Sequence, residues 1–318
     1  MRIEAEANRS ECFKRISEIN RNRILNHLNA LVGERHPDSA PAAMKTAVDY
    51  LFRQMNSYGM KITKQPIDSD AWRPFPNIIA TATGMRASKA PAEEELLVVG
   101  AHYDTVSASP GADDNASGLA VLLEVARILS TMQGALQPQF VAFTMEEAGF
   151  LGSEYYLREA ERRGAKIWGA IVLECVGYTD HGDGSQKRPP GLPIPIPDRG
   201  DFIGLVGNRS AGPIQRAFES AVKTHVPNLP LVSLLVPENG EAVPDTRRSD
   251  HVPFWDRGLR AAMLTDTANF RNPHYHEKSD RLETLDLSFI TDIARALAAA
   301  IVRLCERQHP EENETGNI

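Results

Sequence analysis

The sequence has few of the features that mark several classes of protein. Its 318 residues include three cysteines, at positions 12, 175 and 305, an odd number without CxxC spacing. This count excludes a disulfide scaffold and predicts scattered, buried thiols in the reduced state. Positive charge is not in excess either, because the formal net charge is −7 and no dense stripe of Lys and Arg occurs. We therefore expect no nucleic-acid partner.

Long apolar runs are missing as well. No stretch approaches the roughly 20 apolar residues that cross a bilayer, and residues 1–6 contain no apolar signal-peptide region. No internal repeat is visible, and no pattern indicates a particular oligomeric state. The expectation is a cytoplasmic protein without a membrane partner.

What the sequence does contain is the pattern of an ordinary folded α/β protein. Hydrophobic residues make up 42% and charged residues 24%, so the body of the chain has the composition of a globular domain. Apolar spacing predicts helices at 10–32, 40–57, 116–132, 152–163, 213–225 and 285–307, and strands at 60–65, 77–82, 95–101, 139–144, 167–175, 202–206, 231–236 and 259–264. This alternation predicts a three-layer α/β/α sandwich with a largely parallel, mixed central sheet.

One segment, 180–200, is too rich in proline and glycine to be a helix or a central strand. It could be a linker between two domains, but the strand and helix pattern continues past it. We therefore interpret it as a surface loop that overhangs a site, within a single domain spanning residues 1–307. The polar, acidic residues 308–318 are expected to form a disordered tail.

Polar residues gather where the predicted strands end, which is where open α/β sheets bind ligands. His102 and Asp104 follow one buried strand, and Glu146 and Glu147 follow another. Glu174 closes an apolar strand. Adjacent carboxylates are costly to hold together unless a cation or protons compensate, whereas the cluster of His102 and Asp104, taken alone, is better explained by a satisfied polar turn.

Two further clusters contain the same residue types. A glycine-rich loop with Asp113 and Asp114 opens a helix, which Asp114, Asn115 or Ser117 could instead simply cap. The segment 272–280 contains His274 and His276. Histidine nitrogens and carboxylate oxygens are the ligands that zinc takes. The residue types alone do not choose between neighbouring aspartates, glutamates or histidines. Together the five clusters predict a metal-assisted hydrolytic site.

Five motifs in this order resemble the family of two-zinc aminopeptidases that also contains glutamate carboxypeptidase-like enzymes and glutaminyl cyclases. The motifs are His102-Tyr-Asp-Thr, Gly111-Ala-Asp-Asp-Asn-Ala-Ser-Gly, Met145-Glu-Glu-Ala-Gly-Phe-Leu-Gly-Ser, Ser249-Asp-His-Val-Pro-Phe, and Tyr275-His276 followed by Ser279-Asp280. The resemblance covers about residues 77 to 285 and implies the zinc exopeptidase (phosphorylase/hydrolase-like) fold.

The resemblance also implies which residues hold the metal. One zinc ion would be held by His102, Asp114 and Glu174, and a second by Asp114, Glu147 and His276, so that Asp114 bridges. Asp104 would orient His102 through its other ring nitrogen. The peptide bond between Asp114 and Asn115 would be cis.

By the same resemblance, the chain is a zinc-dependent exopeptidase. It would hydrolyse the N-terminal bond of a peptide or a small amide with a zinc-activated water, for which Glu146 is the general base. Tyr275 would donate to the developing oxyanion, although a ring packed beside the metal loop explains it nearly as well.

Glu174 is a departure, because two-zinc peptidases more often have Asp there, and it leaves open whether one zinc or two are bound. The alternatives are a glutaminyl cyclase-like transferase with one zinc and a non-catalytic interaction module of the same fold. Modules of that kind tend to lose ligands, whereas every ligand position here is filled by a competent residue. Zinc is the expected metal, with cobalt or manganese as alternatives.

Overall fold

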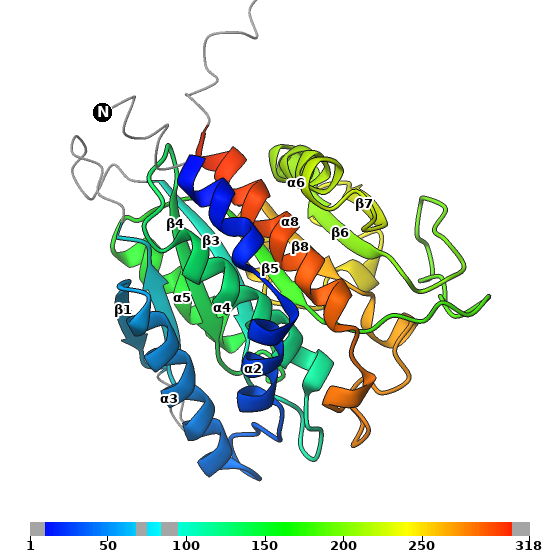
Figure 1. Cartoon of the computed structure of the whole chain (residues 1–318), viewed down its shortest axis with the longest axis horizontal. Coiled ribbons are helices and arrows are strands. Elements are labelled where there is room, and N and C mark those ends of the chain that lie inside the picture. The colour runs from blue at the N-terminus through cyan, green and yellow to red at the C-terminus, as the bar shows by residue number, and fades with distance from the viewer. Residues whose placement is uncertain (1–9, 68–74, 84–94, 307–318) are drawn as a thin grey trace, which may run out of the picture.

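A mixed eight-stranded sheet lies at the centre of the molecule (Figure 1). The computed structural model describes residues 10–67, 75–83 and 95–306, and the statements below concern these residues. The strand order is β1-β2-β4-β3-β5-β8-β6-β7. The strands are β1 (Lys61–Gln65), β2 (Asn77–Thr81), β3 (Glu95–His102), β4 (Gln137–Phe143), β5 (Lys166–Glu174), β6 (Ile203–Asn208), β7 (Leu231–Val236) and β8 (Ala261–Thr265).

The four central strands β4, β3, β5 and β8 run parallel to one another. Antiparallel pairs flank them, since β2 pairs with β4, β1 with β2, and β6 with β8 in the opposite direction. The central strands are almost continuously apolar, as in β3 with Leu-Leu-Val-Val-Gly-Ala, because both of their faces are covered. The predicted α/β class with a largely parallel, mixed sheet is confirmed.

Helices cover both faces of the sheet and give three layers. The larger apolar core joins one face to α2 (Arg21–Leu31), α3 (Pro41–Ser57), α4 (Gly118–Leu129), α6 (Gly212–His225) and α8 (Leu287–Cys305). The smaller core joins the opposite face to α5 (Leu151–Arg162) and α7 (Val252–Asp256). In Figure 1, α2, α4 and α8 lie in front of the strands, on the first of these faces.

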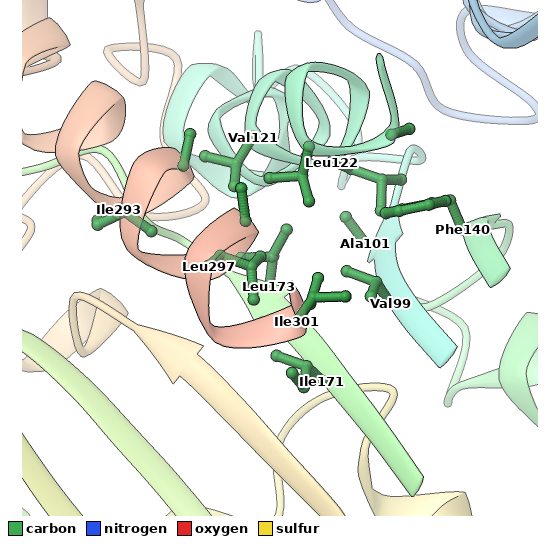
Figure 2. Close-up of a cluster of buried hydrophobic side chains, with 14 of the residues drawn as sticks. Val99, Ala101, Val121, Leu122, Phe140, Ile171, Leu173, Ile293, Leu297 and Ile301 are labelled. Carbon is green, nitrogen blue, oxygen red and sulfur yellow. The ribbon is translucent and has the colours of Figure 1, made fainter. Parts of the chain in front are cut away.

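The packing of α4 and α8 against the sheet fixes the segment that precedes α4. Figure 2 shows Ile293, Leu297 and Ile301, spaced by four residues along α8, pointing toward side chains of β3 and β5. Val121 and Leu122 of α4 enter the same cluster. Burying each such side chain contributes about 1.5–3 kcal/mol, so this core holds the N-terminus of α4 firmly over the sheet.

The leading helix departs from the prediction. We expected one helix at 10–32, but the described chain has an α-helical turn, a 3-10 turn (Ile16–Glu18) and then α2. Ile19 adopts an extended conformation with φ −65° and ψ 120°, and the side chain of Asn20 accepts a hydrogen bond from Arg23 N to cap α2. A local capping interaction thus outweighs the continuous apolar spacing.

Two other expectations concern the C-terminal tail and the membrane. The predicted tail at 308–318 lies outside them. Among the helices that are described, none has both the length and the apolar content needed to span a membrane.

Candidate metal centre

The ends of three neighbouring parallel strands place the candidate residues at one edge of the sheet. His102 is the last residue of β3 and Glu174 the last residue of β5, while Glu146 and Glu147 follow β4. Asp114 reaches the same edge from the turn that leads into α4. His276 reaches it from the loop after β8, so residues far apart in the sequence meet in one place.

Two groups of three ligands share Asp114. His102 Nε2 lies 3.1 Å from Asp114 Oδ1 and 3.4 Å from Glu174 Oε2. His276 Nε2 lies 3.0 Å from Asp114 Oδ2 and 3.3 Å from Glu147 Oε2. Within each group, one ligand atom per residue lies within 4.8 Å of the others. Each oxygen of Asp114 therefore faces a different group.

The donor atoms of this cluster fit a metal better than they fit one another. Within the described residues, His102 Nε2, Asp114 Oδ1 and Glu147 Oε1 are buried and have no hydrogen-bond partner, although the first two lie only 3.1 Å apart. Buried polar atoms are normally paired, so three unpaired donor and acceptor atoms within these two groups need another partner. One imidazole and two carboxylates per group is a ligand set that zinc takes, and we conclude that these residues fit zinc.

The electrostatics of the cluster point the same way. Burial, together with the neighbouring Asp114, raises the pKa of Glu147 to about 7, and burial raises the pKa of Glu146 well above its usual range. Burial lowers the pKa of His276, but its contacts with Asp114 and Glu147 outweigh that effect and raise the value to about 10. The neutral forms of Glu146 and Glu147 are therefore favoured, as expected where carboxylates are buried close together and a nearby positive charge would stabilise them.

Asp104 ties two of the strand-end turns together. Its carboxylate oxygens accept hydrogen bonds from Glu146 N and Glu147 N, both at 3.1 Å. His102 Nδ1 lies 3.1 Å from the backbone oxygen of Asp104 and 3.7 Å from Oδ1, so the backbone oxygen is the nearer acceptor. Asp104 thus fixes the Glu146–Glu147 turn as well as lying beside His102.

The structure also separates the neighbouring residues that the pattern left open. Asp113 points away from the cluster, where it accepts hydrogen bonds from Gly177 N and Asn272 Nδ2. His274 Nδ1 contacts Ser279 Oγ at 2.9 Å instead of the carboxylates. Tyr275 lies beside the site with its ring stacked on that of His276, at a centroid distance of 3.9 Å.

Some residues of the site were not assigned a role from the sequence. Ser249 Oγ donates to Glu174 Oε2 at 2.7 Å, and the buried side chains of Arg35 and Asp280 hold the turn before Asp114. The Ser249 and Asp280 motifs were visible, but contacts across 75 to 167 residues have no spacing rule that could reveal them. The Asp114–Asn115 peptide bond is cis, as the resemblance implied.

An apolar pocket adjoins the cluster. Glu174 and Tyr275 line its inner end, and strands β6, β7 and β8 supply its floor. Leu192, Ile194 and Ile196 of the proline-rich loop form its outer wall. The bridge between Asp180 and Gly200 closes the base of this loop.

Comparison with known proteins finds relatives of similar sequence. The uncharacterized protein YfbL of Escherichia coli K12 is 34% identical to this chain over 276 residues, which cover 81% of each chain. Aminopeptidase YwaD of Bacillus subtilis is 28% identical over 71% of this chain and 44% of its own length.

Solved structures share the fold. LapA aminopeptidase of Legionella pneumophila has a TM-score of 0.71 at 18% identity, covering 94% of this chain and 76% of that one. BSAP, a zinc aminopeptidase from Bacillus subtilis, has a TM-score of 0.56 at 23% identity, and the match covers 74% of this chain and 52% of that one. Glutaminyl cyclase of Macrostomum lignano has a TM-score of 0.69 at 17% identity, covering 94% of both chains.

A family profile provides the assignment. The profile described as Peptidase family M28 matches residues 77–301, more than half of the chain and the part that contains every ligand discussed above. The chain therefore belongs to peptidase family M28.

Proposed function

We propose that this protein is a zinc-dependent aminopeptidase that binds two zinc ions and removes the first residue of a peptide. The observation that carries the proposal is the pair of three-ligand groups that share Asp114, each with one histidine and two carboxylates. The second group, with Glu147 and His276, is complete, which favours two ions over the single zinc of a cyclase. The aminopeptidase relative YwaD and the zinc aminopeptidase BSAP support the same activity.

The residues would divide the work as follows. His102, Asp114 and Glu174 would hold one ion, and Asp114, Glu147 and His276 the other. Zinc, when bound, lowers the pKa of a coordinated water from about 15.7 toward 7 and polarises a carbonyl. Glu146 is buried and lies close to His102 and Glu147, but neither of the two groups that share Asp114 needs it as a ligand. It would accept the proton of the attacking water and pass it to the leaving amine.

The apolar pocket would receive the side chain of the substrate's first residue. Its lining is mostly aliphatic and aromatic, and it also includes Glu174 and Tyr275, the charged Asp245 and Arg248, and three threonines. Transfer of an apolar side chain from water into such walls is favourable by about 0.8 kcal/mol for each methylene buried. The preferred substrates are therefore peptides, or aminoacyl amides, that begin with leucine or phenylalanine.

The central test joins metal analysis to an activity assay on Glu146→Gln. Zinc-loaded wild-type protein should contain two zinc ions and release nitroaniline from leucyl and phenylalanyl anilides. Because Glu146 transfers the proton, the variant should keep both ions and lose activity by about 10²- to 10⁴-fold. Glu159→Gln, in an exposed ion pair on α5, is the matched control and should keep wild-type activity.

The assay also separates the alternatives. Full activity in Glu146→Gln would rule out the proposed base. Release of ammonia from a glutaminyl peptide, without release of an amino acid, would favour a cyclase, to which the Macrostomum lignano structure is the relevant neighbour. A chain that held zinc and turned over none of these compounds would support an interaction module.

A further inference from the structure

The turn that carries Asp114 is held from one side by a buried cation. The Arg35 guanidinium lies within hydrogen-bond distance of the backbone oxygens of Pro110, at 3.1 Å, and Gly111, at 2.9 Å. The same side chain donates to the oxygens of Tyr103, Leu31 and Gly33. Arg35 is 1% exposed. Its hydrogen bonds join the end of α2 to the turns after His102 and before Asp114.

The other side of the same turn is held by a buried anion. The three successive amides of Ala112, Asp113 and Asp114 all donate to Asp280, at 3.3 Å to its backbone oxygen and at 2.9 and 3.1 Å to its two carboxylate oxygens. Asp280 is fully buried and belongs to the loop that also presents His276. The peptide group between Gly111 and Ala112 therefore contacts both residues, since its oxygen accepts from Arg35 and its N–H donates to Asp280.

From this arrangement we propose that Arg35 and Asp280 act together as a clamp that positions the shared ligand Asp114. The inference rests on the proposed two-zinc function. A bridging carboxylate must present both oxygens in fixed directions, and groups that orient a ligand tune metal binding without touching the metal. Arg35 and Asp280 are positioning residues in this sense.

Gly111 shows how closely the clamp fits. Its φ of 59° lies in the left-handed region, and a Cβ there would lie 2.4 Å from Asp114 O and 2.8 Å from Arg35 Nη2. Only glycine lets the guanidinium reach the backbone at this point. The turn is thus built around the arginine, and lysine, with three donors on one nitrogen, cannot contact five carbonyl oxygens.

The test is the affinity of the metal-free protein for zinc ions, measured by competition with a chromophoric chelator. Arg35→Lys keeps the charge and loses most of the contacts, and Asp280→Asn replaces one acceptor oxygen with an amide nitrogen. Each variant should bind zinc about 10- to 100-fold more weakly, as expected when a group that orients a ligand is changed. The double variant should lose less than the product of the two single effects, because both release the same turn.

Two matched controls separate positioning from general stability. Arg295→Lys alters an arginine that holds a backbone oxygen, Ile19 O, and Asp286→Asn alters a carboxylate that accepts two backbone amides at the start of α8. Both should bind zinc like wild type, even where the unfolding temperature of the metal-free protein falls.

Wild-type zinc affinity in both single variants would overturn the proposed clamp but not the proposed function. Arg35 and Asp280 would then contribute only to the stability of the fold. Fully multiplicative effects in the double variant would contradict their joint action. A wild-type chain that bound no zinc would overturn the proposed function together with the clamp.

Discussion

At the scale of single residues, Glu174 shows how a longer ligand is accommodated. It is the final residue of β5, and one of its oxygens lies 3.4 Å from His102 Nε2. Ser249 Oγ donates to that same oxygen and Cys175 Sγ lies 3.5 Å from the other. These contacts hold both carboxylate oxygens of Glu174 at the end of β5, beside His102.

Tyr275 offers a test of how the oxyanion is stabilised. Its ring is held flat against His276, and burial together with nearby carboxylates raises the pKa of its hydroxyl, which stays protonated and able to donate. Removing one oxyanion donor typically lowers kcat by about 10²- to 10³-fold. We expect Tyr275→Phe to show this loss in the anilide assay while its zinc content and KM stay near wild type. Unchanged kcat would mean that the ring acts through packing.

Residue types at strand ends were enough to predict which side chains gather at the site. His102, Glu147 and Glu174 could be grouped because parallel strands end at one edge. The choice of Asp114 over Asp113, and of His276 over His274, came from motif resemblance, because the sequence of a turn does not tell which of two neighbouring side chains points into the site. The contacts made by Arg35 could not be predicted, since five backbone oxygens from separate segments leave no pattern in side-chain type.

At the scale of elements, a buried charge cluster joins α4 to α2. Glu124 on α4 is fully buried and contacts Arg127 on its own helix and Arg23 and His27 on α2. Burial raises the pKa of Glu124, but hydrogen bonds from His27 and Arg127 outweigh it and hold the value at about 2. The helix that follows the metal turn is thus fixed by charge as well as by the apolar core.

Removing this charge should weaken the packing of α4. Glu124→Gln removes the carboxylate that pairs with Arg127, which is 12% exposed, and with Arg23, which is 43% exposed. Loss of one partner from a pair that is largely buried costs about 3 kcal/mol in the free energy of unfolding, measured with denaturant. The contribution of Glu124 is present above the unfolded-state pKa and is lost as pH falls toward about 2, so the gap between wild type and variant should narrow in acid. An equal gap at all pH values would contradict the assignment. The exposed Glu159→Gln control should change stability little.

The order of strands and helices could be predicted because apolar spacing is a local signal. Predicted and observed strands agree within a few residues, as for β3 and β7. The interruption of the leading helix at Ile19 and Asn20 could not be predicted, because the spacing of apolar residues continues through it and is equally compatible with one unbroken helix.

At the scale of the whole molecule, metal binding and stability should be linked. The ligands come from β3, β5, the turn before α4 and two loops, and none of these segments is held in place in the unfolded chain. A ligand that binds the folded state alone adds about 4 kcal/mol at a thousand times its Kd. Chelation of zinc should therefore lower the unfolding temperature, as followed by scanning calorimetry. Asp114→Asn, which weakens both groups, should show a much smaller shift, and an equal shift would place the metal elsewhere.

The proline-rich loop at 180–200 lines the apolar pocket but lies apart from the candidate metal ligands in the sequence. Leu192, Ile194 and Ile196 alternate with prolines, whose rings fix φ, and buried Gln186 anchors the loop to Thr267 and Arg271. The loop presents three replaceable side chains on a stiff backbone and contributes no candidate metal ligand. On the proposed function, single substitutions among these three side chains should change the preferred substrate and leave every candidate metal ligand in place.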